Sequence, residues 1–457
     1  MSSTAAFRRA PPRLWITQGF WVLLVIAAAV VLGRAISQAK WLYVGALAFG
    51  LVTLFHPVEM ALGTFAALLP FDKISALGDQ SSTLTYLVGA ASGAVLLGIG
   101  LAGRRLQQPP RAALWWTLLV LWGAATTLWA LDQQVAFHSL PSFFALLMLY
   151  LVTVSFRVTE KELDWVVLLT IAGGCAAGLF VIYEFLQGRF YHAVSMRGSL
   201  IIGHRETNPN SLADSLLLPM AFAIGSTIEM RRCLKKMLLF GGLIIIASSV
   251  LVTMSRGALL GVAVIMLVYF YRYRAGWRKL LLTCAPLLSL LLLMPDSFFL
   301  RWQEAFTTGG AGRLDIWQAG LWALKKHMLF GTGLGNFTVV YNDFAGYAPR
   351  FAGFSRDSHN TYLGIATELG LIGFLLFVAA VFSQFRAAGE ARRSSVPPLM
   401  VAAEAACYAI LVAGMFGDML WDKTFWFSSM LLMLVSQVDK NRLSLLTKNC
   451  AYSDSCP

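Results

Sequence analysis

The segment SRDSHN (355–360) is followed at once by TYLGIATELGLIGFLLFVAAVFSQF (361–385), so a charged stretch meets an apolar run with no linker between them. The apolar run is longer than the roughly 20 residues that an α-helix needs to cross the hydrocarbon core of a membrane. The junction therefore predicts a membrane-spanning helix that begins at Thr361. It also predicts a polar outer segment directly before that helix.

The rest of the chain has the composition of such helices. Of its 457 residues 58% are hydrophobic and 13% are charged, and the mean hydropathy is +0.68. A soluble domain of this length does not need so much apolar surface. We expect an all-α polytopic membrane protein, a single integral membrane domain over residues 1–457, with about 12 and at most 14 transmembrane helices. The expected spans are 15–33, 41–55, 57–70, 84–103, 112–131, 136–155, 165–187, 211–230, 237–254, 257–271, 279–295, 361–385, 398–416 and 424–438.

Basic residues gather on one side when these spans alternate, and the positive-inside rule makes that side cytoplasmic. They are Arg8, Arg9, Arg13, Arg104, Arg105, Arg111, Arg157, Lys161, Arg231, Arg232, Lys235, Lys236, Arg272, Arg274, Arg278, Lys279, Arg386, Arg392, Arg393, Lys440 and Arg442. Both termini are then cytoplasmic, and the outer loops are 71–83, 188–210, 255–256, 296–360 and 417–423. The net charge of +13 belongs to these short loops, so we expect membrane lipids as partners and no nucleic acid.

The six cysteines have no metal-ligand spacing, and four of them lie in or beside expected spans. The sequence also lacks a phosphate-binding loop, a His/Cys/Glu cluster and a Gly-x-Ser-x-Gly motif. We therefore expect neither a metal nor a cofactor. The basic segment before Leu14 resembles a cytoplasmic flank rather than a cleaved signal.

The large outer loop 296–360 is expected to be partly helical. From Arg313 onward, Leu314, Trp317, Leu321 and Leu324 recur at helical spacing, which predicts that they form the apolar face of an interfacial helix. The glycine-rich run 331–336 is expected to end this helix as a loop.

Arginines on the expected outer side are the first candidates for chemistry. Arg197 and Arg205 lie in the loop 188–210, Arg256 lies in a two-residue turn, and Arg313 opens the loop helix. Arginine offers planar, permanently charged donors that match phosphate oxygens, so several of them together would bind a phosphate or pyrophosphate headgroup. The alternative for each one is contact with ordinary lipid phosphates.

His359 is the candidate general base, because it stands at the mouth of a span and histidine exchanges protons near neutral pH. Asp357 and Asn360 are placed to orient its imidazole. A structural role for this histidine is the alternative.

The motif His359-Asn360, nine residues, Gly370-Leu-Ile-Gly373 resembles the His-[Asn/Ser/Gln]-x9-Gly-x-x-Gly signature of bacterial O-antigen ligases. The segments 253–257 (TMSRG), 312–317 (GRLDIW) and 333–337 (GLGNF) resemble motifs of the wider O-antigen ligase/polymerase superfamily, and Asn208-Pro209-Asn210 at the start of a span fits as well.

The resemblance implies a twelve-helix enzyme of the bacterial inner membrane with a periplasmic active site. Such an enzyme moves a glycan from undecaprenyl pyrophosphate to a sugar hydroxyl of lipid A–core, without metal and with inversion. By this resemblance His359 is the base and Arg256 and Arg313 hold the pyrophosphate. Arg205, Arg197 and Asn360 are further candidates for substrate binding.

Three other functions stay open at this point. An O-antigen polymerase would use the same donor with a second lipid-linked glycan as acceptor. A protein-glycosylating relative would be expected to carry a further soluble region. A transporter of lipid-linked sugars would be expected to hold charges near the membrane midplane.

Overall fold

The structure is a computed structural model, and it describes residues 52–53, 55–75, 83–192, 195–272, 278, 296, 298–300, 303, 310, 312–347, 353–392 and 397–452. The expected spans 15–33 and 279–295, and most of the span 41–55, lie outside these residues.

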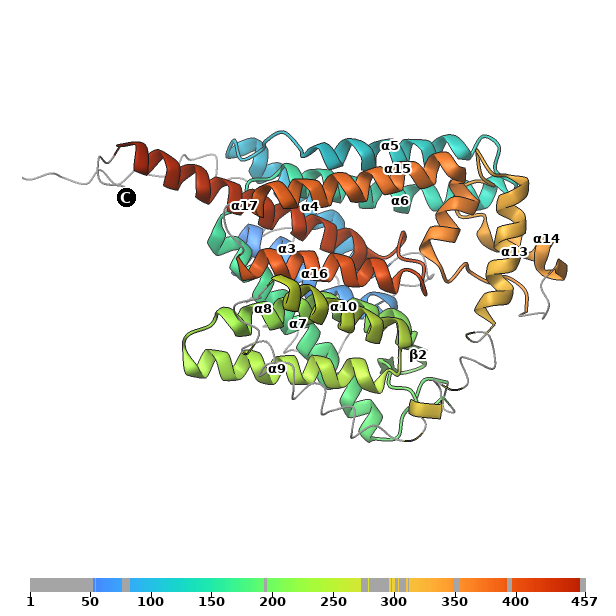
Figure 1. The fold of residues 1–457 in the computed structure, drawn as a ribbon, viewed down its shortest axis with the longest axis horizontal. Helices are drawn as coiled ribbons and strands as arrows, with labels where there is room; N and C mark the ends of the chain where they lie inside the picture. Colours follow the sequence, from blue (N-terminus) through green and yellow to red (C-terminus); the bar gives the residue numbers. More distant parts are fainter. Residues whose placement is uncertain are drawn as a thin grey trace, which may run out of the picture.

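The described chain is mostly helical (Figure 1). Its elements are α3 (Pro57–Leu68), η1 (Leu69–Ile74), α4 (Leu84–Ala102), α5 (Arg111–Thr126), α6 (Gln133–Ser155), α7 (Glu160–Leu186), β1 (Ile201–Ile202), β2 (Arg205–Glu206), α8 (Pro209–Glu229), α9 (Cys233–Val252), α10 (Arg256–Arg272), α13 (Arg313–Lys326), α14 (Phe337–Phe344), η4 (Ala345–Tyr347), α15 (Thr361–Arg392), α16 (Pro398–Ala413) and α17 (Lys423–Tyr452). The two short strands pair in antiparallel fashion within the expected outer loop 188–210.

Six of these helices are long and apolar enough to cross a membrane: α4, α6, α7, α8, α9 and the α15 segment Thr361–Glu390. The shorter α16 is apolar as well. The structure is thus consistent with the predicted polytopic membrane protein, and the helix at Thr361 begins at the predicted residue.

The helices pack side by side into one bundle, with α16 against both α8 and α10 and with α15 against α5 (Figure 1). The faces of α16 are lined largely by alanine, which lets neighbouring backbones approach closely. An aromatic cluster packs between α5 and α17, where the ring centroids of Trp116 and Trp426 are 5.0 Å apart. The indole N–H of Trp116 donates to Gln384 of α15 at 3.2 Å, so this buried polar group is satisfied.

Helix α13 lies across one end of the bundle, beside α14 (Figure 1). A helix starting at Arg313 was predicted and is confirmed. That Leu314, Trp317, Leu321 and Leu324 form an apolar face at the membrane interface stays a prediction, and the structure shows which face packs against the protein. Leu314 and Leu321 are more than half exposed, whereas Ile316, Ala319, Gly320 and Ala323 are buried. Small residues occupy the buried face because α13 packs closely on its neighbours. A Cβ on Gly320 would lie 3.0 Å from both Leu363 and Phe337.

The glycine-rich run 331–336 is a loop, as predicted, and it docks on a kink in α15. Gly370 at the kink has φ +70°, and a Cβ there would lie 2.2 Å from the carbonyl oxygen of Leu329. Gly331 has φ +73° and approaches the carbonyl of Glu368 just as closely. Backbone hydrogen bonds join the two segments, among them Gly333 N to Glu368 O at 2.9 Å. The kink and the loop therefore require glycine on both sides.

Candidate functional site

Ser358 and Asn360, the two neighbours of His359 directly before α15, are held by hydrogen bonds. The indole of Trp317 in α13 donates to the carbonyl of Ser358 at 3.1 Å. The hydroxyl of the buried Ser358 donates to the carbonyl of Asn360 at 3.0 Å. The side-chain oxygen of Asn360 accepts from the backbone N–H groups of Tyr362 and Leu363, at 3.0 and 3.1 Å, and so caps α15. Asn360 thus has a defined structural role, and substrate binding by this residue stays a prediction.

His359 lies between these two anchored residues in a left-handed conformation, with φ +45°. Such a backbone is uncommon for a residue other than glycine and persists only where the surroundings impose it. The side chain is half-buried. Burial lowers the pKa of His359 below its usual 6.5, and the charge of Arg313 lowers it further, while Asp357 acts in the opposite direction. The imidazole is therefore neutral at pH 7, which is the form that accepts a proton.

Arg313, at the start of α13, lies close enough to His359, at the end of the large outer loop, for its charge to act on the imidazole. The Arg313 charge acts on His359 and also on Asp214 of α8. Its guanidinium carbon lies 5.9 Å from the centre of the Phe416 ring, which belongs to the loop between α16 and α17.

Arg256 is the first residue of α10, and that helix start also contacts Phe416. A Cβ on Gly257 would lie 3.4 Å from Cβ of Phe416. Ser255 precedes the helix, and its carbonyl accepts from the N–H of Leu259 at 3.1 Å. A helix N-terminus that carries an arginine favours anions, through both its N–H groups and its dipole. Phe416 thus packs against the helix start that carries Arg256 and also lies near Arg313.

The first residue of α15 also fixes the loop between α16 and α17. The hydroxyl of Thr361 donates to the carbonyl of Gly417 at 2.8 Å and accepts from the N–H of Met419 at 2.8 Å. The segment that carries His359 and the loop that carries Phe416 are therefore joined directly.

Two carboxylates of the loop between α16 and α17 were missed by the sequence reasoning. Asp418 is exposed, but the protein around it still desolvates its carboxylate and raises its pKa to about 6, with the charge of Asp357 as the next cause. Desolvation also raises the pKa of Asp422, while the charge of Lys73 opposes the shift. The signal was present in FGDMLWDK (416–423), a polar stretch between two expected spans.

Arg197 is buried and has protein partners. It donates to the carbonyl of Thr253 at 2.8 Å and to the side chain of Asn210 at 2.6 Å. It therefore ties the turn before Arg256 to the start of α8. Direct substrate contact by Arg197 remains a prediction.

Arg205 lines a large cavity of about 1670 Å³. Helices α4 and α6 form an apolar wall, while His204, Arg205, Lys73 and Lys423 contribute basic groups. Of the described residues, His359, Arg256 and Arg313 do not line this cavity. Lys73 connects the two regions, because its charge acts on both Asp418 and Asp422.

An ion pair closes one edge of the cavity. Lys423 donates to Asp72 at 2.6 Å and to the hydroxyl of Thr83 at 2.9 Å, and Thr85 also donates to Asp72. Burial alone would raise the pKa of Asp72, but Lys423 and the two threonines outweigh it and the pKa is lowered.

The described residues contain no group of three or more His, Cys, Asp or Glu side chains that is arranged to hold a metal ion. The groups around Phe416 and the cavity offer basic side chains, the neutral imidazole of His359 and separate carboxylates. Such an arrangement is suited to binding an anionic group next to a proton acceptor.

Comparison with known proteins relates part of this chain to a described family. A search of curated proteins found no match to the chain. Residues 241–378, which include Arg256, Arg313 and His359, match the family model described as O-antigen ligase. This match over residues 241–378 supports an O-antigen ligase/polymerase superfamily member.

Proposed function

We propose that the protein is an O-antigen ligase of the bacterial inner membrane, which transfers a glycan from undecaprenyl pyrophosphate to a sugar hydroxyl of lipid A–core. Membership of the superfamily supports a role as ligase or polymerase in lipopolysaccharide assembly. The histidine motif that begins at His359 favours the ligase. The active site would face the periplasm, with both termini in the cytoplasm.

The observation that carries this proposal is the meeting of three elements at Phe416. Arg313 lies over its ring, the α10 start with Arg256 packs beside it, and the Arg313 charge reaches the neutral His359. In the proposed reaction, His359 takes the proton from the acceptor hydroxyl. The hydroxyl oxygen then bonds to the anomeric carbon as the bond from that carbon to the pyrophosphate oxygen breaks.

The pyrophosphate leaves with the electron pair of the broken bond and stays on the polyprenol. Pyrophosphate is a good leaving group, so the protein has to activate the hydroxyl and stabilise the developing charge. Arg256 and Arg313 are proposed for the second task. Attack from the face opposite the leaving group inverts the anomeric centre.

The cavity beside Arg205 is proposed to receive part of a lipid-linked substrate. Its apolar wall on α4 and α6 suits a lipid tail, and its basic groups suit a phosphate. Both substrates are anchored in the membrane, which raises their local concentration at the site.

The test is a reconstituted assay with purified full-length protein, polyprenyl-pyrophosphate-linked glycan and lipid A–core. His359→Ala is expected to lower the transfer rate by about 10²- to 10⁴-fold, the usual contribution of a general base. His327→Gln is the control, because residue 327 caps the far end of α13, roughly 20 Å along the helix from Arg313. Undiminished transfer by His359→Ala would refute the assignment of the base.

The acceptor decides between ligase and polymerase. A ligase forms product with lipid A–core as acceptor. If product forms only from two lipid-linked glycans, the protein is a polymerase, and the proposed acceptor is wrong.

A further inference from the structure

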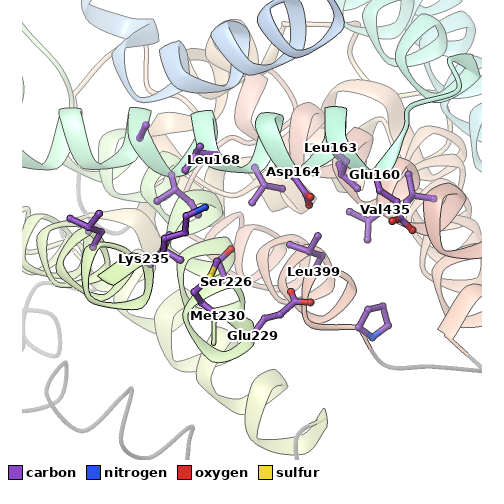
Figure 2. A pocket seen from close by; sticks show the side chains of 18 of the residues that line it. Glu160, Leu163, Asp164, Leu168, Ser226, Glu229, Met230, Lys235, Leu399 and Val435 are labelled. Atoms are coloured by element: carbon purple, nitrogen blue, oxygen red, sulfur yellow. The ribbon is translucent and has the colours of Figure 1, made fainter. Parts of the chain in front are cut away.

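A second cavity, of about 760 Å³, lies at the opposite end of the bundle from His359. Helices α10 and α15 begin at the His359 end, whereas α7, α9 and α16 begin, and α8 ends, around this cavity. Figure 2 shows the wall of this cavity, with side chains from α7, α8, α9, α16 and α17 around one space. None of the site residues described above lines it.

The cavity changes from charged to apolar along its length. On α7 the lining begins with Glu160 and Asp164 and continues with Leu168, Ile171 and Cys175. This stripe covers roughly 22 Å at 1.5 Å per residue. One leaflet contributes about half of the 30 Å hydrocarbon core. The stripe is therefore long enough to run from the headgroup level through one leaflet.

Helix α9 repeats the same order. Lys235 lies at the charged end, and Leu238, Leu239 and Gly242 follow deeper in the wall. A Cβ on Gly242 would lie 2.8 Å from the sulfur of Cys175, so glycine lets α9 approach α7 closely here, and this contact forms the deep end of the cavity. The exposed Leu168 and Leu238 show that the cavity reaches the outer surface of the bundle. An amphiphile can thus enter from the bilayer.

The charged end carries both signs. Its carboxylates are Glu160, Asp164, Glu229 and Asp439, and its basic groups are Arg231 and Lys235. Figure 2 shows Glu160 and Asp164 on α7, Glu229 on α8 and Lys235 on α9 around the same space. A headgroup with a negative charge alone would meet an excess of carboxylates. A headgroup that carries an ammonium and a phosphate would find a partner for each.

We propose that this cavity binds a membrane phospholipid with a phosphate and a primary ammonium, such as phosphatidylethanolamine. The phosphate lies at Lys235 and Arg231, and the ammonium donates to Asp164 and Glu229. One acyl chain follows the apolar stripe of α7. A choline headgroup has no N–H to donate, and a phosphoglycerol headgroup has no cation, so both bind more weakly.

Native mass spectrometry of the full-length protein in detergent tests this. The probes are phosphatidylethanolamine, phosphatidylcholine and phosphatidylglycerol with identical acyl chains. We expect the first to bind about tenfold more tightly than the other two, the effect of roughly one charge-assisted hydrogen bond. Equal affinity for all three lipids would overturn the proposal.

Variants of the charged end assign the two halves of the headgroup. Asp164→Asn combined with Glu229→Gln is expected to remove the preference for phosphatidylethanolamine. Lys235→Ala is expected to weaken all three lipids. Lys236→Ala is the matched control, since this exposed neighbour does not line the cavity. A loss of binding in Lys236→Ala equal to that in Lys235→Ala would contradict the site.

A blocking variant tests the apolar part. Ala172 lines the cavity, whereas Ala176, one turn further along α7, is also exposed but does not. Ala172→Trp should therefore lower lipid occupancy while Ala176→Trp leaves it unchanged. Equal occupancy in the two variants would count against the acyl-chain path.

Photocrosslinking identifies the occupant in membranes. With p-benzoylphenylalanine in place of Leu168, irradiation should add the mass of one aminophospholipid to the protein. A crosslink to a peptide of this chain instead would mean that protein fills the cavity, and the proposal would be wrong.

Discussion

His359 is held in a conformation that its own side chain does not favour. Its φ of +45° persists because the carbonyl of Ser358 accepts a hydrogen bond from Trp317 and because Asn360 caps α15. Burial lowers the pKa of the imidazole below its usual 6.5, and the nearby charge of Arg313 lowers it further. One arginine therefore has two proposed tasks, to bind pyrophosphate and to keep the base deprotonated.

Arg313→Gln separates these tasks in a pH profile. Because the pKa of His359 is lowered, its imidazole stays neutral until the pH falls below the usual 6.5. Activity should therefore fall only at pH values below 6.5, where the imidazole takes up a proton. Removing the Arg313 charge raises this pKa, and the acid limb of kcat/KM should move to higher pH. Arg356→Gln is the comparator, because its charge acts on His359 less than that of Arg313. An acid limb at the wild-type pH in Arg313→Gln would contradict the coupling.

Arg256→Lys keeps the charge and loses the planar fork of the guanidinium. If Arg256 binds pyrophosphate through two hydrogen bonds, kcat/KM should fall roughly 10- to 100-fold, the value of one charge-assisted hydrogen bond. Arg189→Lys serves as control, since Arg189 pairs with Glu184 at 2.7 Å and lies half-exposed in the outer loop. Equal kinetics of Arg256→Lys and the wild-type protein would rule out bidentate binding.

At the scale of elements, the glycine kink of α15 determines where the outer loop docks. Leu329 and Gly331 approach the helix at Gly370 more closely than any side chain permits. Glu368, next to the kink, accepts from the N–H groups of Gly335 and Phe337 at 2.9 and 3.1 Å, and so fixes the start of α14. Glycine is therefore required at position 370 of the motif, because the backbone has a positive φ there and another segment approaches it closely.

Gly370→Ala should destabilise the protein, because the new Cβ would collide with the Leu329 carbonyl and alanine disfavours φ +70°. The backbone conformation alone costs about 1–3 kcal/mol, so the melting temperature in detergent should drop. Gly389→Ala is a matched control in the same helix, with nothing within 4 Å of its Cβ position. That variant should be neutral or slightly stabilising. Equal melting temperatures of the two variants would contradict the docking argument.

For the whole molecule, the pair formed by Asp72 and Lys423 joins the first described helices to the last one. The pair lies at the edge of the large cavity, and its side chains are 14% and 16% exposed. It connects residues far apart in sequence through one ion pair and two threonine hydroxyls. Breaking such a pair leaves a charge in a poorly solvated place.

Lys423→Met should lower stability, by at most about 3 kcal/mol because the pair keeps some contact with solvent. The pKa of Asp72 is lowered in the folded state from its usual 3.8. Its stabilising contribution is therefore present above that value and is lost as the pH falls through the folded pKa. Melting curves should show the gap between wild type and Lys423→Met closing below about pH 4. An unchanged gap at low pH would show that the Asp72 charge is not responsible.

Much of the fold follows from local patterns. The apolar run after His359, the helix that starts at Arg313 and the loop at residues 331–336 were all predicted, because hydropathy and glycine content act over neighbouring residues. The face of α13 that packs against the protein was not predicted. Its choice depends on how closely Phe337 and Leu363 approach, and spacing along one helix does not contain that information.

The sequence by itself determined the membrane class, the candidate residues for the proposed chemistry and the resemblance to O-antigen ligases. These properties reside in composition and in short motifs. Only the tertiary structure decided that Arg313, the start of α10 and the His359 segment meet around Phe416, that Arg197 is committed to protein partners, and that Asp418 and Asp422 lie near the site. The physical reason is that such convergence depends on packing between helices far apart in the chain, where close contact and desolvation set each charge.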